Sequence, residues 1–318
     1  MSLCLVVDDL HPSWQSLFQE INLTTHYRPD LTAAEVPAAL AAHAYEGLVV
    51  RSKVRVTAKL LAHCPGLRYV ARAGAGVDNI DEAAMQAAGV TLLNAPEGNR
   101  DAVGEFALGL LLALLRNIPR ADQEVRQNIW QREANRGEEL GGKVVGIIGY
   151  GNMGRAFAQR LTSFGCTVLA YDNDPTCAPD HQATLVTLSE LQQRAEVLSL
   201  HIPYSVPNHH FVNEAMLLGF RNPIWLLNTA RGEVLDQAAV VRGLQSGQVR
   251  GAALDVLENE KLNTLTPAQQ TTFDFLKKAP QVILSPHIGG WTHQSYQRIN
   301  EVLAQKIGAF LRASARLS

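Results

Sequence analysis

The chain has 318 residues, which at roughly 150 residues per domain predicts about two domains. Its 28 basic and 30 acidic residues give a net charge of −2, and this balance argues against a nucleic-acid binder or a polybasic membrane-binding protein. Hydrophobic residues make up 47% of the chain and charged residues 18%, as in an ordinary globular protein.

The four cysteines, Cys4, Cys64, Cys166 and Cys177, have neither CxxC nor zinc-finger spacing. This favours a reducing, cytoplasmic setting, and we expect no metal site. The longest apolar run, residues 106–115, is about half the ~20 residues that a membrane-crossing helix needs. The apolar stretch at residues 3–7 is followed at once by two acids, unlike a secretory signal.

The first third of the chain predicts a parallel α/β sheet. Apolar runs that end at polar or turn residues predict strands, and Ala- and Leu-containing segments between them predict helices. The expected strands are residues 3–7, 48–50, 67–72 and 90–94, and the expected helices are residues 32–44 and 57–63. Strands that alternate with helices are typical of parallel sheets.

Residues 101–117 predict the most apolar helix of the chain, with Asp101 as its cap and Pro119 just beyond its end. A helix that is apolar on nearly all sides is buried, either between domains or against another subunit. Residues 120–139 are polar and charged around the single Trp130, so we expect an exposed arm there rather than a core helix.

The α/β alternation restarts at Lys143. The expected strands are residues 144–148, 167–171, 197–201, 224–228, 251–255 and 282–285, and the expected helices are residues 155–164 and 295–313. Together the two patterns predict an α/β fold with two Rossmann-like, doubly wound parallel sheets and a hinge near residue 97.

A dinucleotide fingerprint, G-x-G-x-x-G, follows the strand at residues 144–148. Its glycines are Gly149, Gly151 and Gly154, and Asn152 and Met153 lie between the last two. The glycines permit a tight turn, close approach of a pyrophosphate to the backbone and close packing of the next helix. The helix N-terminus adds a positive dipole end for the phosphates.

Asp172 closes the next expected strand, 18 residues past Gly154. A carboxylate at this position accepts hydrogen bonds from ribose hydroxyls and repels a 2′-phosphate, so we expect NAD rather than NADP. The alternative is a glycine-rich turn in a Rossmann-like domain that binds nothing or binds another nucleotide.

Three polar residues come after strands of the second sheet: Arg231, Glu260 and His287. Ligands of open α/β sheets bind beyond the carboxyl ends of the strands, so these side chains can converge on the edge that would hold the cofactor. Taken singly, each has an ordinary explanation as a surface ion pair, a solvated acid or a turn residue.

Several ordered motifs make the chain resemble the D-isomer-specific 2-hydroxyacid dehydrogenase family over nearly its whole length. They are Ala73-Gly74-Ala75-Gly76-Val77-Asp78-Asn79-Ile80-Asp81, Asn94-Ala95-Pro96 with Gly98-Asn99, the Gly149–Gly154 fingerprint, Asn228-Thr229-Ala230-Arg231-Gly232, Ala253-Leu254-Asp255-Val256 with Glu260, and Ser285-Pro286-His287-Ile288-Gly289-Gly290. Among the members of this family, the chain most resembles the short phosphoglycerate dehydrogenases.

The resemblance implies a discontinuous substrate-binding domain, residues 1–97 and 291–318, and an NAD-binding Rossmann domain, residues 98–290. It also implies a homodimer built largely from the NAD-binding domains. His287 would be the proton donor and acceptor at the substrate oxygen, Glu260 would favour its charged form, and Arg231 would hold the substrate carboxylate.

The remaining site residues follow from the same motifs. Cofactor contacts are expected from the fingerprint residues and Asp172, from the catalytic Arg231 and His287, and from His201, Ile202, Pro203, Thr229, Ala230, Asp255 and Gly289. Backbone N–H groups of Ala75 and Gly76 would form a second clamp on the substrate carboxylate. Asn99 is expected at the substrate as well.

The expected substrate is 3-phosphoglycerate or its keto form, 3-phosphohydroxypyruvate, which would place the protein in serine biosynthesis. Arg51 and Lys53 follow one expected strand and Arg72 ends another, where a phosphate could be held. The alternative is that Arg51, Lys53 and Arg55 are solvated charges at strand ends. Because the chain ends soon after its last helix, we expect no C-terminal regulatory domain and no feedback by serine.

Other functions remain open at this point. A glyoxylate or hydroxypyruvate reductase, or another 2-keto acid reductase, would use the same residues without a phosphate site. A non-catalytic NAD-sensing regulator could share the fold, since fold does not fix function. A formate dehydrogenase would have no use for a His–Glu proton relay, whereas a phosphonate dehydrogenase could use the histidine. Lys261 and residues 204–210 depart from the family pattern.

Overall fold

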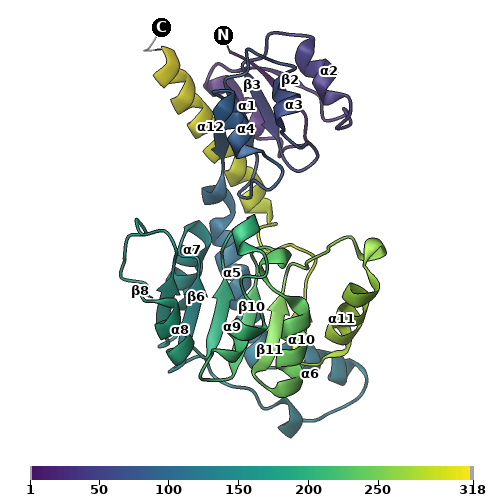
Figure 1. Ribbon diagram of the computed structural model, residues 1–318, viewed down its shortest axis with the longest axis vertical. Coiled ribbons are helices and arrows are strands. Elements are labelled where there is room, and N and C mark those ends of the chain that lie inside the picture. The colour runs from purple at the N-terminus through teal and green to yellow at the C-terminus, as the bar shows by residue number, and fades with distance from the viewer. Residues whose placement is uncertain (1, 316–318) are drawn as a thin grey trace. The chain divides into compact units, whose positions relative to one another are not determined.

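The computed structural model describes residues 2–315, which divide into two compact units. Unit 1 comprises Met1–Asn99 and Trp291–Ser318, and unit 2 comprises Arg100–Gly290. The chain crosses between the units after Asn99 and again after Gly290. The boundaries expected from the sequence were after residues 97 and 290. The chain thus forms two α/β units (Figure 1), as the sequence predicted.

Unit 1 is built on a five-stranded parallel sheet with the strand order β2-β1-β3-β4-β5. Its strands are β1 (Leu3–Val6), β2 (Thr24–Tyr27), β3 (Gly47–Val50), β4 (Tyr69–Arg72) and β5 (Thr91–Asn94). The inner strands are continuous apolar runs because both faces of the sheet are covered. This order is one of the two common doubly wound arrangements.

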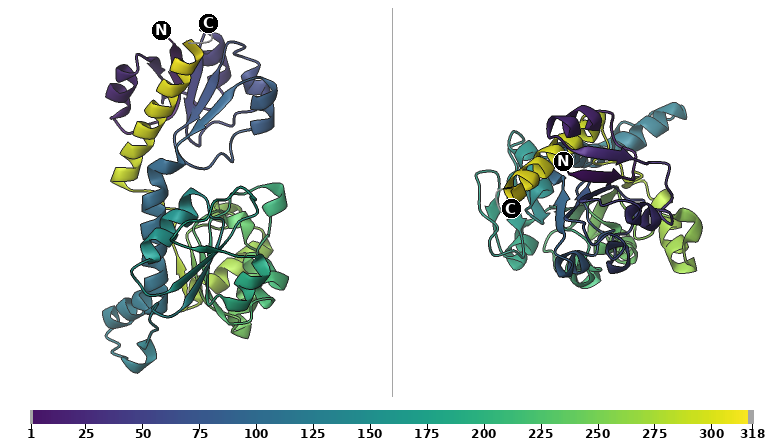
Figure 2. Two further views of the ribbon diagram at one scale, coloured as in Figure 1. Left: turned by 90° about the vertical axis from the view of Figure 1, so that its left-hand side faces the viewer. Right: turned by 90° about the horizontal axis from the view of Figure 1, so that it is seen from above.

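Helices cover both faces of the unit 1 sheet. On one face lie α2 (Val36–Ala41), α3 (Ala58–Leu61) and α4 (Glu82–Ala87), and on the other lie α1 (Trp14–Glu20) and α12 (His293–Ala315). Figure 2 shows α12, in yellow, against the purple and blue elements of the N-terminal segment. The two sequence-distant segments therefore share one core.

Unit 2 is built on a seven-stranded parallel sheet with the order β12-β11-β10-β9-β6-β7-β8. Its strands are β6 (Val144–Ile148), β7 (Thr167–Tyr171), β8 (Thr184–Leu185), β9 (Val197–Leu200), β10 (Ile224–Asn228), β11 (Val249–Leu254) and β12 (Val282–Leu284). The order reverses at β6, which pairs with β7 on one side and β9 on the other. This is the Rossmann order, in which the reversal point holds the ligand.

Two helical layers cover the unit 2 sheet. One layer contains α5 (Pro96–Leu115) and α7 (Asn152–Leu161), and the other contains α8 (Leu188–Arg194), α9 (Glu214–Leu218), α10 (Gln237–Ser246) and α11 (Pro267–Lys278). Short 3₁₀ turns, η2 (Val206–Asn208), η3 (Gly232–Val234) and η4 (Leu262–Thr264), lie in loops of this unit. Side-chain caps such as Thr266, in a capping box with Gln269, fix several helix starts.

The apolar helix α5 begins earlier than the sequence predicted. It starts at Pro96 rather than at residue 101, so Asp101 lies inside the helix and does not cap it. Proline is well suited to a first helical turn because its missing N–H has no partner there in any case. Leu111 and Leu115 of α5 are buried in the core of unit 2 itself, which corrects the expectation of burial between domains or subunits.

Some elements differ from the sequence predictions in extent or were missed. The helix expected at 32–44 is the shorter Val36–Ala41, the one expected at 155–164 is Asn152–Leu161, and the last helix runs over His293–Ala315 instead of 295–313. The sequence patterns did not predict α1, β2 and α4 of unit 1, nor α6, β8, α8, α9, α10 and α11 of unit 2. Strand β2 reads Thr-Thr-His-Tyr and lies at the sheet edge, so it carries no apolar alternation.

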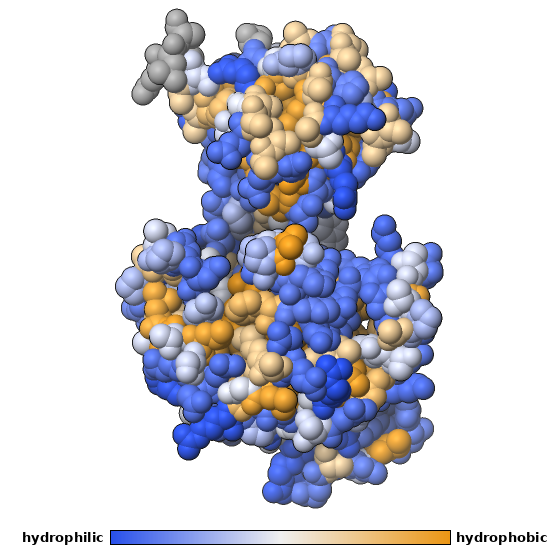
Figure 3. All heavy atoms as spheres, viewed as in Figure 1, coloured by the Kyte–Doolittle hydropathy of each residue, from blue (hydrophilic) through white to orange (hydrophobic). Residues whose placement is uncertain are grey.

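The polar segment after α5 forms an exposed arm, as predicted. It contains α6 (Ile118–Arg126), which buries no side chain, and the 3₁₀ turn η1 (Glu133–Asn135). Trp130 is 84% exposed. Figure 3 shows hydrophilic side chains over most of the visible face of unit 2, with apolar side chains scattered among them. Within residues 2–315 no single helix has the length and apolar character of a membrane span, although α5 and α6, bent by 62°, meet that test as a pair.

Candidate active site

The fingerprint loop follows β6 at the reversal point of the unit 2 sheet. Gly149 has a φ of +91°, and a Cβ there would lie 2.6 Å from the carbonyl oxygen of His201. A Cβ on Gly154 would lie 2.1 Å from the carbonyl oxygen of Gly149. Both positions therefore require glycine, the first for its backbone conformation and the second for close packing of α7 on the loop.

The N-terminus of α7 is open at the point where the fingerprint predicts a pyrophosphate. Gly151 is the N-cap residue, and no side chain caps this helix. A Cβ on Gly151 would meet no other atom within 4 Å. The next residues of the loop, Asn152 and Met153, form the first turn of the helix. Exposed N–H groups and the helix dipole make such a terminus an anion site.

Asp172 lies directly after β7 and beside the fingerprint loop. Its Oδ2 accepts a hydrogen bond from the backbone N–H of Tyr150 at 2.6 Å, and its Oδ1 accepts one from that of Asp174 at 2.9 Å. These bonds fix the carboxylate at the end of the strand. Each oxygen retains a second lone pair for a ribose hydroxyl.

Sequence reasoning missed a brace beneath the fingerprint loop. Tyr150 is 1% exposed, and its hydroxyl donates to Asp180 Oδ1 at 2.7 Å. Arg155 of α7 pairs with Asp180 Oδ2 at 2.6 Å and places its guanidinium 4.4 Å from the Tyr150 ring centroid. The brace ties the loop and the helix to the segment after β7. Only the aromatic residue inside the fingerprint hinted at it.

His201, Ile202 and Pro203 follow β9, next to the fingerprint loop. Burial lowers the pKa of His201 to about 4, so its ring is neutral at pH 7. Its Nε2 lies 2.8 Å from the Ser199 hydroxyl. The carbonyl of His201 and the side chain of Ile202 face Gly149. These residues shape one wall of the loop and add no charge to it.

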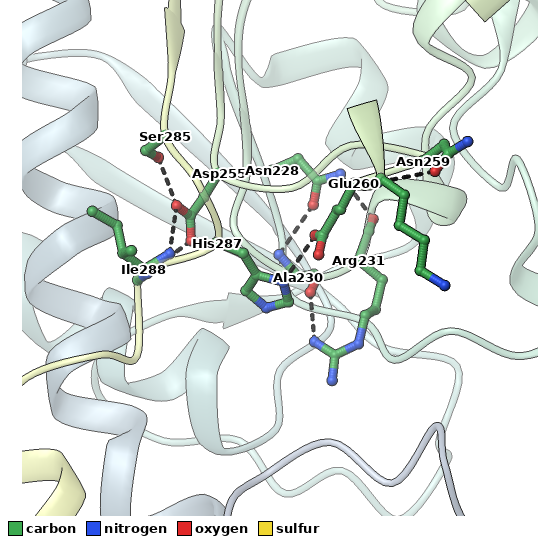
Figure 4. Close-up of polar contacts among 11 residues, drawn as sticks. Asn228, Ala230, Arg231, Asp255, Asn259, Glu260, Ser285, His287 and Ile288 are labelled. Carbon is green, nitrogen blue, oxygen red and sulfur yellow. Dashed lines mark hydrogen bonds and ion pairs between the residues drawn. The ribbon is translucent and has the colours of Figure 1, made fainter. Parts of the chain in front are cut away.

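His287 and Glu260 form a direct pair at the carboxyl edge of the same sheet. His287 Nδ1 and Glu260 Oε1 are 2.8 Å apart, and the two side chains are 44% and 48% exposed. Figure 4 shows the imidazole and the carboxylate pointing toward each other, with the Nε2 side of the ring left for another group. Their positions after strands of the second sheet and the family resemblance predicted that these two residues act together, and the structure brings them together.

The environment of His287 favours its protonated form. The hydrogen bond that His287 donates to Glu260 raises the pKa of His287 above its usual 6.5, and the charge of Glu260 acts in the same direction. Partial burial and the positive charge of Arg231 oppose this rise. An imidazolium at this position can donate a proton, and the neutral ring can take it back.

Asp255 anchors the loop that carries His287. The carboxylate is 2% exposed and accepts hydrogen bonds from the Ser285 hydroxyl at 2.6 Å, the Ile288 N–H at 3.0 Å and the Gly289 N–H at 2.8 Å. His287 itself has a φ of +56°, an unusual conformation for a residue with a side chain. Asp255 therefore holds His287 in a backbone conformation that the chain would otherwise leave.

Arg231 follows β10 in the motif of residues 228–232. Asn228 is fully buried, and its amide donates to the Arg231 carbonyl at 2.9 Å while its oxygen accepts from the Ala230 N–H at 3.1 Å. Arg231 Nη1 donates to the Ala230 carbonyl at 2.7 Å. Figure 4 shows the guanidinium on the same side of the loops as the His287 ring. Thr229, in the same turn, is 9% exposed.

Besides Arg231, the residues expected at the substrate lie in unit 1, at the ends of its strands, in the loops after them or at the start of α5. Ala75 and Gly76 follow β4, where the Asn94 amide donates to the Ala75 carbonyl at 2.8 Å and holds the loop. Arg72 ends β4, and its Nη1 donates to the Ala73 carbonyl at 3.4 Å. Asn99 lies in the first turns of α5, and its Oδ1 is buried.

Arg51 and Lys53 follow β3 but differ in their surroundings. Lys53 Nζ donates to the carbonyls of Pro29 at 2.9 Å and Leu31 at 2.7 Å, so its ammonium group holds the loop after β2. These bonds give Lys53 a structural role, which is an alternative to the phosphate contact that the sequence suggested. The guanidinium of Arg51 lies instead beside two adjacent aromatic rings, those of Trp291 and Tyr296, which no sequence motif indicated.

The residues of unit 2 fit a bound dinucleotide. The fingerprint glycines leave room for a close approach, the α7 N-terminus has no competing side-chain cap, and the Asp172 carboxylate stands at the end of β7. Each of these features lies at the carboxyl ends of parallel strands next to the sheet reversal, where dinucleotides bind in such folds. Bound there, NAD would supply the group that accepts or donates a hydride.

This fold and site define a dinucleotide-dependent oxidoreductase class, and comparison with known proteins gives the family. Residues 108–289 match the model of the D-isomer specific 2-hydroxyacid dehydrogenase, NAD binding domain. The chain is 35% identical over 312 residues to D-3-phosphoglycerate dehydrogenase of Mycobacterium tuberculosis, which covers 96% of this chain and 56% of that protein. The chain belongs to the D-isomer-specific 2-hydroxyacid dehydrogenase family, and unit 2 carries its NAD-binding domain.

Other relatives differ in their names and in how much of them the chain covers. The chain is 35% identical over 260 residues to hydroxypyruvate reductase of Thermotoga maritima, covering 82% of this chain and 83% of that one. It spans about half the length of the D-3-phosphoglycerate dehydrogenases that it matches. Among solved structures, D-lactate dehydrogenase of Aquifex aeolicus, complexed with NAD and lactic acid, has a TM-score of 0.81 at 26% identity, covering 99% of this chain and 97% of the other.

Proposed function

We propose that this protein is an NAD-dependent dehydrogenase that interconverts a D-2-hydroxy acid and the corresponding 2-keto acid. The observation that carries the proposal is the His287–Glu260 pair, which lies at the carboxyl edge of the unit 2 sheet. A proton relay is needed only if an oxygen of the substrate gains or loses a proton. Reduction of a ketone needs one hydride and one proton, and oxidation of the alcohol releases both.

In the proposed reduction, negative charge develops on the carbonyl oxygen at C2 of the keto acid. The protonated Nε2 of His287 donates its proton to that oxygen, while Glu260 stabilises the imidazolium from the Nδ1 side. Arg231 binds the substrate carboxylate with its planar fork of N–H donors and polarises the carbonyl. In the oxidation, neutral His287 accepts the hydroxyl proton. The backbone N–H groups of Ala75 and Gly76 serve as a further carboxylate clamp.

We propose that Gly149, Gly151, Asn152, Met153 and Gly154 hold the pyrophosphate of NAD and that Asp172 holds the adenosine ribose. The open α7 N-terminus and the fixed Asp172 carboxylate support this arrangement. His201, Ile202 and Pro203 would line the adenosine half. Thr229, Ala230, Asp255 and Gly289, together with Arg231 and His287, would border the nicotinamide half, where the hydrogen-bonded Asp255 loop keeps its shape.

We propose 3-phosphoglycerate and 3-phosphohydroxypyruvate as the substrate pair, which is a reaction of serine biosynthesis. The 35% identity to D-3-phosphoglycerate dehydrogenase of M. tuberculosis supports this choice. So do Arg51 and Arg72, which follow or end neighbouring strands of unit 1. Asn99 would also contact the substrate. The comparably similar hydroxypyruvate reductase of T. maritima favours a second candidate, a reductase of unphosphorylated 2-keto acids.

A panel of 2-keto acids separates these candidates. The oxidation of NADH is followed with 3-phosphohydroxypyruvate, hydroxypyruvate, glyoxylate and pyruvate. We expect the highest kcat/KM with 3-phosphohydroxypyruvate. Highest activity with an unphosphorylated acid would reject the phosphoglycerate assignment and keep the dehydrogenase activity. No turnover of any acid, together with tight NADH binding, would instead favour a non-catalytic NAD-sensing regulator on the same fold.

We also propose a homodimer formed by the NAD-binding unit. The arm after α5 supports this, because Ile118, Val125 and Trp130 are 54%, 51% and 84% exposed and α6 buries no side chain. Sedimentation equilibrium should give twice the mass of the chain, and Val125→Glu should shift the protein toward the monomer.

We also propose a reducing, cytoplasmic setting. The four cysteines all lie within the described residues and form no disulfide there, which agrees with this setting.

A further inference from the structure

Two adjacent aromatic rings, those of Trp291 and Tyr296, lie beside the Arg51 guanidinium in unit 1 and are called the aromatic bracket here. The Cζ atom of Arg51 lies 4.9 Å from the ring centroid of Trp291 and 5.0 Å from that of Tyr296. The two rings are themselves in contact, with centroids 5.2 Å apart and planes inclined by 42°. Trp291 begins the second segment of unit 1, and Tyr296 lies in the first turns of α12. Sequence-distant parts of the unit thus meet at one cation.

The rest of Arg51 is fixed through its backbone. Its N–H donates to Asp8 Oδ2 at 2.6 Å, and its carbonyl accepts from the Asn79 amide at 3.0 Å. The guanidinium makes one hydrogen bond to a described residue, from Nη1 to the Asp9 carbonyl at 3.3 Å. Within residues 2–315 its Nε and Nη2 donors have no protein partner. Donors in the plane of the cation therefore remain available to a ligand.

Two acidic neighbours make this arrangement informative. Asp8 and Asp9 lie just beyond the end of β1, yet the Arg51 guanidinium forms no ion pair with either carboxylate in the described part of the chain. The buried Asp8 carboxylate accepts the Arg51 backbone N–H, and Asp9 Oδ1 accepts from the Tyr27 hydroxyl at 2.8 Å. Both carboxylates are thus bound elsewhere, and the rings hold the cation instead.

The bracket also explains an exposed aromatic residue. Trp291 is 56% exposed, although it packs against Tyr296. Tyr296 is fixed by a hydrogen bond from its hydroxyl to the Asp9 carbonyl at 3.2 Å and by edge contact with His11 at 5.6 Å. A rigid ring beside a flexible arginine restricts the rotamers of the arginine, and the attraction of the ring face for a cation adds to this effect.

We propose that Trp291 and Tyr296 are positioning residues that hold the Arg51 guanidinium for a phosphate ester and thereby set the preference for phosphorylated over unphosphorylated substrates. This inference rests on the proposed function, because it concerns the substrate of that same reaction. Neither aromatic residue touches the ligand in this account. Both act through Arg51, which is the residue that contacts the phosphate.

A binding measurement tests the bracket without requiring turnover. Isothermal titration calorimetry of the NADH-loaded protein, in which no hydride can be transferred to the hydroxy acid, gives Kd for 3-phosphoglycerate and for D-glycerate. Trp291→Ala should raise Kd for 3-phosphoglycerate roughly 5- to 30-fold, as expected for a cation–π contact, and should change Kd for D-glycerate less than about twofold. Trp291→Phe retains a ring and should restore most of the affinity.

A double-mutant cycle shows whether Trp291 acts through Arg51. In an Arg51→Ala background, Trp291→Ala should have no further effect on Kd for 3-phosphoglycerate, because the group that it positions is gone. Equal losses for both ligands, or the same loss with and without Arg51, would overturn the inference. Equal affinity of the unaltered protein for both ligands would overturn it as well.

The outcomes also separate this inference from the proposed function. If 3-phosphoglycerate binds through the bracket but no 2-keto acid is reduced, the proposed dehydrogenase activity fails and the bracket stands. If 3-phosphohydroxypyruvate is reduced but Trp291→Ala binds 3-phosphoglycerate as well as the unaltered protein does, the bracket fails and the proposed activity stands.

Discussion

The carboxyl edges of the two sheets are built in different ways. At the edge of unit 2, the polar side chains of the site are fixed by other protein groups: Glu260 holds His287, Asp255 holds the loop around it, and Asn228 holds the turn of Arg231. At the edge of unit 1, Lys53 is fixed by two carbonyls, whereas Arg51 is held by aromatic rings and keeps donors for a ligand. In our proposal the first edge serves the chemistry and the second serves substrate selection.

Replacing His287 should produce the largest effect on the chemistry assigned to unit 2. His287→Ala should lower kcat for keto-acid reduction by roughly 10²–10⁴-fold, the usual contribution of a general acid or base. Steady-state kinetics measure the loss, and titration with NADH should show that the variant still binds the cofactor. An unchanged kcat would contradict the role of His287 as the proton donor.

Arg231→Lys should produce the next largest effect, mainly on the keto acid. A lysine keeps the charge but cannot make the two-point contact with a carboxylate, so kcat/KM should fall by about 10- to 100-fold. The loss should be similar for 3-phosphohydroxypyruvate and for hydroxypyruvate, since both carry the carboxylate. A loss confined to the phosphorylated acid would place Arg231 at the phosphate and would break the division between the two edges.

Glu260→Gln should act mainly on pH dependence. Glu260 raises the pKa of His287, and the reduction requires the protonated ring, so kcat/KM for reduction should fall as pH rises through that raised pKa. Without the carboxylate, the pKa of His287 drops and the fall should begin at a lower pH. Oxidation requires the neutral ring and should show the opposite pH dependence. A pH profile of Glu260→Gln that coincides with that of the unaltered protein would contradict the pairing.

Lys53→Met should produce the smallest effect and sharpens the contrast within unit 1. It removes the hydrogen bonds to the Pro29 and Leu31 carbonyls, so Tm should fall by about 1–3 °C. Because the ammonium group is already bound by the protein, the ratio of kcat/KM for phosphorylated and unphosphorylated acids should change less than about twofold. Loss of the preference for phosphorylated acids would instead indicate that Lys53 contacts the phosphate, as the sequence suggested.

The same contrast explains what could be predicted from the sequence. In a parallel sheet every loop after a strand reaches the same edge, so Arg231, Glu260 and His287 could be assigned to one site from strand order alone. The resemblance to a known family agreed with this assignment. The fingerprint and the doubly wound sheets were predicted for the same reason, because continuous apolar strands and glycine turns are local signals.

The features that the sequence did not reveal depend on contacts between distant segments. The role of Lys53 depends on carbonyl groups of a loop after the edge strand β2, and the bracket joins Arg51 to residues of the last segment of the chain. Neither contact leaves a periodic pattern. The start of α5 at Pro96 was missed because a proline after Asn-Ala favours a turn as readily as a first helical turn.

The most direct test of the central claim is the reduction of NAD⁺ by the two enantiomers of 3-phosphoglycerate, measured with the purified protein as the rate of NADH formation. The account predicts that the D enantiomer reduces NAD⁺ and that the L enantiomer does not, because one His–Glu pair and one carboxylate-binding arginine fix which face of C2 meets the cofactor. Equal rates with both enantiomers, or a higher rate with the L enantiomer, would contradict it.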